Sequence, residues 1–234
     1  DVIDTIEKTN SIQPDRLAFY SYAHVPWIKG NGQRGFNDED IPKDDKKRML
    51  YETGKKLLFE NGYHEIGMDH FALKTDTLYD AFENGTLHRN FMGYSSSKTK
   101  LMIGLGVSSI SDSWYSFAQN VKSLEEYYQL LERNKLPVYR GHLLTGEDLI
   151  IRKHILNLMC QFETSWKNQE AYFEEIPEVL NQLKEMENDG LLIIKENSIA
   201  VTEKGKPYVR NICMAFDLRL KRKAPETELF SMTI

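Results

Sequence analysis

The chain has 234 residues, 41% of them hydrophobic, and a formal net charge of −5 at pH 7. This size suffices for one large domain or two smaller ones around a sizeable core. The negative charge argues against a protein that attracts nucleic acid or another polyanion through its overall field. The longest apolar runs, such as residues 101–107, are far shorter than the roughly 20 residues of a membrane span. We therefore expect no membrane span and no signal peptide.

The two cysteines, Cys160 and Cys213, lie far apart in segments with helical patterns. Buried, reduced thiols in a cytoplasmic protein explain them better than a disulfide does, although a disulfide stays an alternative. The first residue is Asp rather than Met. We therefore expect a fragment of a longer protein or a processed product.

The first 112 residues carry the pattern of α/β structure. Glycine follows each expected helix, and the first helix begins with proline and acidic residues, which favours these boundaries. Strands are expected over 16–23, 63–68 and 100–110, and helices over 42–62 and 75–85, with Thr75 as the N-cap of the second helix. Strands that alternate with helices indicate βαβ units and hence a parallel sheet.

The remainder of the chain is predicted to be mainly helical. Serine or threonine begins each of the first two helices, and the second start has the spacing of a capping box. Helices are expected over 123–134, 145–162 and 175–190, followed by a hairpin over 191–201 and a last helix from 202. The apolar residues of the first of these helices fall on one face. Helix, two-stranded hairpin and helix together form a winged-helix-like pattern.

A strand-like apolar run, residues 62–73, contains the polar pair Asp69 and His70 beside Phe71. Ligands bind at strand ends in α/β folds, so this cluster is a candidate for a functional site. With His64, the pair offers three metal ligands, but their spacing matches no closed zinc motif. A hydrogen-bonded structural pair is the favoured interpretation, and no metal site is predicted in this chain.

Two phosphate-binding motifs are incomplete. Gly104 and Gly106 give G-x-G after an apolar run, but Ser109 occupies the place of the third glycine. In "GYSSSKT", residues 93–99, Ser97 stands where a P-loop has glycine before its lysine. Neither motif therefore indicates a nucleotide-binding loop.

Winged-helix modules often bind DNA through one helix. The charge of the helix over 175–190 therefore indicates whether this module binds DNA. That segment carries five acidic residues and a single lysine, Lys184. Such a helix repels phosphate. The basic run 219–223 equally complements a helix dipole. A packing module between domains is therefore favoured over one that binds nucleic acid.

Ten sequence blocks together resemble one known family. They are "YAHVPW" (22–27), "QRGF" (33–36), "GYHEIGMDHFAL" (62–73), "GTLHRNFMGY" (85–94), "IGLGVSSIS" (103–111), "AQN" (118–120), "RG" (140–141), "DGL" (189–191), "VTEKG" (201–205) and "RNICMAFD" (210–217). They occur in the order of the family and span nearly the whole chain. The chain therefore resembles the oxygen-independent coproporphyrinogen III oxidases, which are radical S-adenosylmethionine enzymes of haem biosynthesis.

The resemblance implies an α/β part followed by a mainly α part. Residues 1–112 would supply the last strands and helices of a partial TIM-like radical S-adenosylmethionine barrel. Residues 113–234 would form a helical C-terminal cover domain with a winged-helix-like hairpin. The family's C-x-x-x-C-x-x-C motif, which holds a 4Fe-4S cluster, lies upstream of the residues present here. The chain thus resembles the C-terminal half of the enzyme, and by itself it is expected to be inactive.

The implied reaction is the oxidative decarboxylation of two propionates of coproporphyrinogen III to vinyl groups, which gives protoporphyrinogen IX. S-adenosylmethionine and a 4Fe-4S cluster are the implied cofactors, and a radical derived from the former takes hydrogen from the substrate. An electron donor and an electron acceptor are the further implied partners. The reaction is expected in the cytoplasm, and no general base is needed for the hydrogen abstraction.

The resemblance also implies site residues. Ala23 and Ile110 match positions that contact S-adenosylmethionine, and Phe91 with Met92 matches a pair near substrate and cofactor. The family commonly has glutamine where Met92 stands, and a thioether cannot donate a hydrogen bond as an amide does.

Further candidates follow from chemistry and geometry. Residues at the ends of barrel strands face the catalytic mouth, which places Asp69, His70 and Phe71 at the edge of the site. Four propionates need cationic partners, and Arg34, Arg89 and Arg140 are the candidates because guanidinium binds carboxylate bidentately. Each arginine could equally form a structural ion pair. No catalytic residue is assigned.

Two other classes of protein stay open as alternatives. A related radical enzyme, such as a haem chaperone, would show a haem-binding spectrum. A winged-helix binding module would bind duplex DNA with an affinity that falls steeply with salt.

Overall fold

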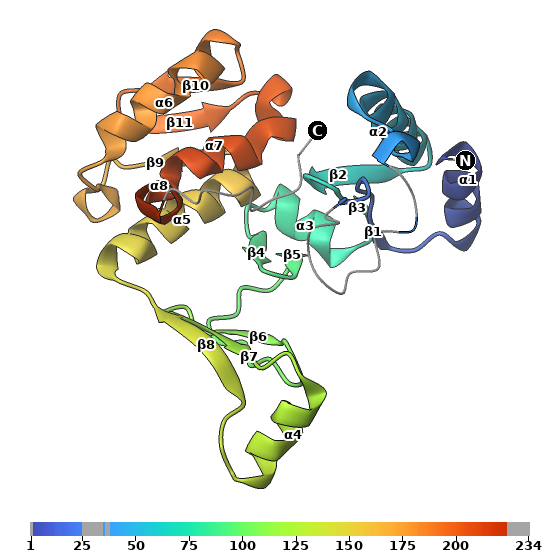
Figure 1. Cartoon of the computed structure of the whole chain (residues 1–234). Helices are drawn as coiled ribbons and strands as arrows, with labels where there is room; N and C mark the ends of the chain where they lie inside the picture. Colours follow the sequence, from blue (N-terminus) through green and yellow to red (C-terminus); the bar gives the residue numbers. More distant parts are fainter. Residues whose placement is uncertain (1, 25–34, 36–37, 224–234) are drawn as a thin grey trace. The chain divides into compact units, whose positions relative to one another are not determined.

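The computed structural model of the chain describes residues 2–24, 35 and 38–223 (Figure 1). It separates into two compact units. The first unit consists of the residues up to Glu83 together with those from Leu218 onward, and the second is Asn84–Asp217. Among the described residues, no helix is both long and apolar enough to cross a membrane.

The first unit contains a three-stranded sheet in the order β1-β3-β2. Its elements are α1 (Val2–Ile12), β1 (Arg16–Ala18), η1 (Asp38–Asp40), α2 (Asp44–Glu60), β2 (Tyr63–Gly67), β3 (His70–Leu73), α3 (Thr77–Glu83) and α8 (Leu218–Lys223). Helices α1 and α2 and strands β2 and β3 each contribute one residue to a shared apolar core, which consists of Ile6, Leu58, Tyr63 and Phe71. Strand β3, which begins with His70 of the candidate site, is the central strand of this sheet and is joined to the two helices by this core.

The predicted parallel sheet is wrong, because every strand pair in the described parts of the chain is antiparallel. Strand β2 returns directly as β3, with Gly67 opposite His70 and only two residues between them. A parallel neighbour would need a crossover connection of a dozen or more residues. The expected strand over 16–23 is also shorter and ends at Ala18. The described residues thus contain α/β structure but no closed barrel.

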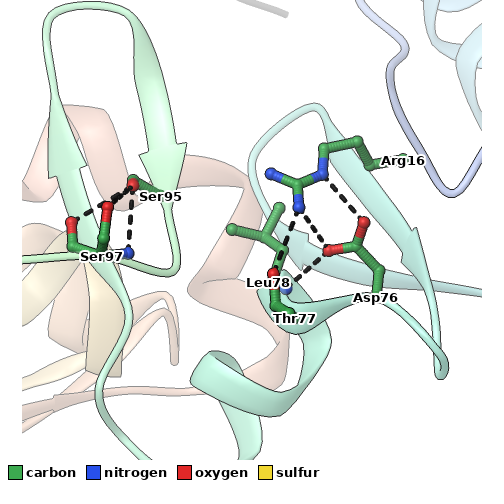
Figure 2. A network of polar contacts seen from close by, with 6 residues as sticks. All are labelled: Arg16, Asp76, Thr77, Leu78, Ser95 and Ser97. Atoms are coloured by element: carbon green, nitrogen blue, oxygen red, sulfur yellow. Dashed lines mark hydrogen bonds and ion pairs between the residues drawn. The ribbon is translucent and has the colours of Figure 1, made fainter.

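The start of α3 is fixed by Asp76 rather than by Thr75 (Figure 2). The Asp76 carboxylate accepts a hydrogen bond from the backbone N–H of Leu78 at 2.6 Å. It also accepts two from Arg16, with Nε to Oδ2 at 2.9 Å and Nη2 to Oδ1 at 2.7 Å. This bidentate pair joins β1 to the first turn of α3, across 60 residues of sequence.

The second unit contains two three-stranded sheets and a hairpin. Its elements are β4 (His88–Asn90), β5 (Gly93–Ser95), β6 (Ile110–Asp112), β7 (Ser116–Asn120), α4 (Leu124–Glu132), β8 (Val138–Leu143), α5 (Gly146–Gln161), β9 (Glu163–Ser165), η2 (Gln169–Ala171), α6 (Ile176–Asn188), β10 (Leu192–Lys195), β11 (Ser198–Val201), η3 (Glu203–Tyr208) and α7 (Val209–Phe216). The sheets have the orders β6-β7-β8 and β10-β11-β9. Helix α5 packs against α7 and β9 and also contacts the β4–β5 hairpin.

Two predicted helix starts in this unit are confirmed by their hydrogen bonds. The capping box of α5 is complete, since Thr145 Oγ1 accepts from the N–H of Asp148 and Asp148 Oδ2 accepts from the N–H of Thr145. The Ser123 hydroxyl accepts from the N–H of Glu126 at the start of α4. Gly190, with φ of +72°, follows α6 in the left-handed conformation that glycine adopts without strain.

The expected strand over 100–110 is mostly irregular in the structure. Only Met102 forms an isolated bridge, opposite Asp112, and β6 begins at Ile110. The segment between them is held by a side chain, because Asn120 Nδ2 donates to the carbonyls of Gly104 and Gly106 at 3.2 and 2.8 Å. An amide side chain can therefore replace a neighbouring strand as the partner of an extended backbone.

Candidate functional site

The polar pair predicted from the sequence lies at the β2–β3 turn of the first unit. Asp69 Oδ1 is 2.9 Å from His70 Nδ1, and both side chains are partly buried. A carboxylate only accepts, so Nδ1 carries the proton of this hydrogen bond and the tautomer of the ring is fixed. The structure thus brings Asp69 and His70 together, as predicted for a hydrogen-bonded pair.

The turn that presents this pair has an unusual backbone. Met68, the first of its two residues, has φ of +50°, a conformation in which glycine, asparagine or aspartate is far commoner. Its carbonyl accepts a hydrogen bond from the Tyr51 hydroxyl at 3.0 Å. Burial, with the charges of Glu65 and Asp69, raises the pKa of Tyr51, so this hydroxyl stays protonated and donates. Tyr51 is therefore a supporting residue that the sequence did not single out.

Close packing on α2 supports the turn from one side. The ring of Phe19 stacks on Tyr51 with centroids 5.5 Å apart, and the N–H of Phe19 donates to the Asp69 carbonyl at 2.7 Å. The buried Gly54 allows this approach, because a Cβ atom there would overlap the Phe19 ring. Lys55 and Glu65 form a second link between α2 and β2, with Nζ and Oε2 2.6 Å apart. The carbonyls of Met68 and Asp69 are thus both held by hydrogen bonds.

Replacing Tyr51 by phenylalanine should lower the free energy of unfolding of the first unit by about 1 kcal/mol, because the Met68 carbonyl loses its donor. Urea denaturation monitored by circular dichroism would measure the change. The matched control is Tyr20→Phe, since Tyr20 is 68% exposed and should contribute almost nothing. Equal stabilities of the two variants would contradict the supporting role of Tyr51.

Three predicted residues lie on the β4–β5 hairpin of the second unit. Phe91 and Met92 form its tip and are 50% and 75% exposed. The guanidinium of Arg89 lies over the ring of Tyr94, 5.4 Å from its centroid. The Tyr94 hydroxyl donates to the carbonyl of Met159 at 2.8 Å and so attaches the hairpin to α5. The β4–β5 hairpin therefore has an exposed apolar tip, and its strands, which include Arg89, are attached to α5.

Two more predicted residues share one row of the β6–β7–β8 sheet. Ile110 lies opposite Gln119, and Gln119 lies opposite Arg140. Opposed residues of antiparallel strands point to the same face, and two strand spacings separate the outer pair by roughly 10 Å. Arg140 Nε donates to Gln119 Oε1 at 2.9 Å, which fixes its guanidinium beside the row. The structure thus gathers a predicted cofactor contact and a predicted carboxylate partner on one sheet.

Asn120 is a positioning residue to which the sequence analysis assigned no role. Besides its two bonds to glycine carbonyls, its backbone N–H donates to the carbonyl of Ser109, next to Ile110. Its burial, with only 7% exposed, makes these bonds difficult to replace. The signal in the sequence is the polar pair Gln119 and Asn120 at the end of an apolar strand.

The remaining predicted residues lie in other parts of the chain. Ala23 is exposed in the first unit, whereas Ile110 belongs to the second. Arg34 lies outside the described residues. Both cysteines are buried, and burial raises the pKa of Cys160 to about 11 and that of Cys213 to about 12. Within the described part of the chain, no three His, Cys, Asp or Glu residues are grouped as metal ligands, so these residues do not fit an iron–sulfur cluster.

Curated relatives match nearly the whole chain. The oxygen-independent coproporphyrinogen III oxidase of Escherichia coli is 38% identical over 225 aligned positions, in an alignment that covers 94% of this chain and 49% of the relative. The enzyme of the same name from Synechocystis is 35% identical over 240 aligned positions, in an alignment that covers 99% of this chain and 51% of the relative. The chain thus spans about half the length of the curated relatives that it matches. No model of a protein family matches the chain.

A solved structure matches as well. It is the coproporphyrinogen III oxidase of Escherichia coli, described as a radical SAM enzyme, with 37% sequence identity and a TM-score of 0.86. The match covers 93% of this chain and 51% of the other. Agreement of sequence and fold over the same extent excludes a chance resemblance of local motifs. The chain therefore belongs to the family of the oxygen-independent coproporphyrinogen III oxidases and corresponds to the C-terminal half of its members.

Proposed function

We propose that this chain is the C-terminal part of an enzyme that converts two propionates of coproporphyrinogen III to vinyl groups in the cytoplasm. The single observation that carries the proposal is the match to the Escherichia coli enzyme, at 38% identity over 94% of the chain. The family's reaction needs an electron donor and an electron acceptor besides the substrate. Its radical chemistry would come from S-adenosylmethionine and a 4Fe-4S cluster whose ligands are not among the cysteines of this chain.

The Asp69–His70 pair would serve as a polar contact at the edge of the substrate site. Asp69 accepts from Nδ1 of His70 and so fixes the orientation of the ring and of Nε2. A chain with a net charge of −5 also needs local cations in order to bind a tetracarboxylate. Arg140, Arg89 and Arg34 are the further proposed partners of the propionates.

The apolar candidates would position the reacting groups. Phe91 and Met92 at the hairpin tip offer exposed apolar surface against a macrocycle or a cofactor ring. Ala23 and Ile110 carry no ionisable group and would contact S-adenosylmethionine through backbone and apolar surface. In these roles the residues would exclude water and hold the substrate, which is what a reaction without a general base requires of the protein.

The part of the chain after residue 112 has a proposed structural role as a cover domain. We infer that α5, β9, α6 and the β10–β11 hairpin form a winged-helix-like cover domain, with the boundary to the barrel part near residue 112. The order helix, strand, helix, hairpin supports this inference. The exposed residues of α6 include Glu178 and Glu185, which favours packing against protein over binding to DNA.

The test is a fusion protein in which this chain replaces the matching half of the Escherichia coli relative. Under anaerobic conditions, with reductant, S-adenosylmethionine and an electron acceptor, we expect protoporphyrinogen IX from coproporphyrinogen III, measured by chromatography after oxidation. His70→Ala should lower kcat/KM about 10- to 100-fold, because a charged hydrogen bond contributes roughly 1.5–3 kcal/mol.

The matched control is His64→Ala on the neighbouring strand β2. His64 contacts the ring of Tyr79, with centroids 4.8 Å apart, and is not part of the turn. Its variant should keep most of the activity. A fusion protein that cleaves S-adenosylmethionine but neither binds nor converts the substrate would overturn the proposal, and a haem-binding spectrum would point to a haem chaperone instead.

A further inference from the structure

Two glycines of the irregular segment before β6 have all their backbone polar groups bound. The N–H of Gly104 donates to Ser111 Oγ of β6 at 3.0 Å. The carbonyls of Gly104 and Gly106 both accept from Asn120 Nδ2 of β7. The N–H of Gly106 donates to the hydroxyl of Tyr127 in α4 at 3.1 Å. The sheet therefore holds all of these groups except the N–H of Gly106, which is held by the helix.

Residues 104–106, which we call the glycine segment, lie directly against the backbone of Ile110. A Cβ atom on Gly104 would come within 2.7 Å of the Ile110 carbonyl oxygen, a separation that Cβ atoms do not reach. The backbone N–H of Asn120 also holds the carbonyl of Ser109, the residue before Ile110. A shift of the glycine segment would therefore displace Ile110.

Tyr127 is the residue that connects α4 to the glycine segment. None of the residues of α4, all of which are described, is fully buried. Tyr127 is partly buried, whereas the adjacent Tyr128 is 56% exposed. The N–H of Tyr127 donates to the carbonyl of Ser123, the N-cap residue, so Tyr127 lies in the first turn of the helix. The position of its hydroxyl is therefore fixed by the start of α4.

Ile110 and Gln119, which lie opposite each other in β6 and β7, fit a ligand with an adenosyl group. Both side chains are partly buried, one of them apolar and the other an amide that donates and accepts. Adenine combines apolar ring faces with a hydrogen-bonding edge, and sites for such ligands pair apolar surface with a few polar groups. The two residues thus have the chemistry that S-adenosylmethionine requires at this position.

We propose that Tyr127 is a positioning residue for the S-adenosylmethionine contact at Ile110. Its hydroxyl holds the N–H of Gly106, and the glycine segment supports the backbone of Ile110. Without the hydroxyl, the N–H of Gly106 loses its acceptor, and the glycine segment is no longer tied to α4. Because the contact at Ile110 belongs to the proposed function, the role of Tyr127 rests on that proposal.

The experiment replaces Tyr127 by phenylalanine in the fusion protein described above, which keeps the ring and removes the hydroxyl. Amide exchange at Gly106 should become roughly tenfold faster, because its hydrogen bond is lost. The Kd for S-adenosylhomocysteine, measured by calorimetry, and the KM for S-adenosylmethionine should each rise about five- to tenfold. The kcat and the KM for coproporphyrinogen III should change less than about twofold, a separation that a general loss of structure would not produce.

The matched control is Tyr128→Phe, because Tyr128 is the next residue of the same helix and is more exposed than Tyr127. It should bind S-adenosylhomocysteine as the unchanged protein does. Ser111→Ala removes the acceptor of the Gly104 N–H and should weaken binding as Tyr127→Phe does, since it acts on the same segment. Thermal unfolding of the three variants would identify any that loses its fold.

Faster exchange at Gly106 with an unchanged Kd would show that Tyr127 only stabilises the fold, and unchanged exchange would show that its hydroxyl does not hold the segment. Either result would overturn the proposal. A fusion protein that binds no S-adenosylhomocysteine would overturn it as well, because the contact at Ile110 would be absent. A fusion protein that binds this analogue, responds to Tyr127→Phe as expected and converts no coproporphyrinogen III would contradict the proposed reaction but support the role of Tyr127.

Discussion

Replacing Arg152 by alanine should lower the free energy of unfolding of the second unit by about 3 kcal/mol. Arg152 Nη2 binds Asp112 Oδ2 at 2.6 Å, and Nη1 donates to the carbonyl of Trp114 at 3.0 Å. The guanidinium also lies 4.4 and 5.0 Å from the ring centroids of Trp114 and Phe117. Both charged side chains are nearly buried, at 13% and 10% exposed. The alanine variant would therefore leave the charge of Asp112 without its partner in a poorly hydrated place.

Urea denaturation monitored by tryptophan fluorescence would measure this loss. Arg152→Lys keeps the charge but lacks the planar fork, and it should lose part of the stability. The double variant Asp112→Asn with Arg152→Met should lose less free energy of unfolding than the variants Asp112→Asn and Arg152→Met lose in sum. The reason is that no unpaired buried charge remains in the double variant. Additive penalties would show that the two side chains do not act as a pair.

Replacing His154 by leucine should cost the same unit roughly 2–4 kcal/mol, because two buried groups lose their partners. His154 lies 2.7 Å from both the Ala171 carbonyl, through Nε2, and the Thr164 hydroxyl, through Nδ1. A carbonyl only accepts, so Nε2 carries the proton and Nδ1 accepts from Thr164. The ring also packs between Phe173 and Phe216, with centroids 5.7 and 5.6 Å away. Leucine retains much of the volume but neither hydrogen bond.

The pH dependence of this difference tests the same contacts. Burial lowers the pKa of His154 in the folded protein, despite the hydrogen bond to the Ala171 carbonyl. Below pH 6.5 the unfolded chain binds a proton that the folded chain does not, so the free energy of unfolding falls as the pH decreases. The leucine variant has no histidine at this position and lacks this pH dependence. The difference in free energy of unfolding between the unchanged chain and the variant should therefore shrink as the pH falls from 8 to 5.5. A deficit that grows toward low pH would show that His154 is charged in the folded protein.

The sequence by itself determined those features that depend on a few neighbouring residues. The helices α2, α4, α5 and α6 and the β10–β11 hairpin occur where caps, glycine stops and apolar spacing predicted them. The starts of α4 and α5 are fixed by hydrogen bonds within one turn, as in the Thr145–Asp148 capping box, and such bonds form without any distant partner. The family also followed from the sequence, because its blocks occur in order along the whole chain.

Only the tertiary structure decided how strands pair and which side chains meet. Alternating strands and helices suggested a parallel sheet, but a two-residue turn at Met68, with positive φ, folds β2 back onto β3. Arg16 finds Asp76 across 60 residues, and no local pattern specifies such a pair. The extended segment before Ile110 depends on the side chain of Asn120 rather than on a strand. These contacts are decided by the burial of backbone and charged groups, whose partners exist only once the chain has folded.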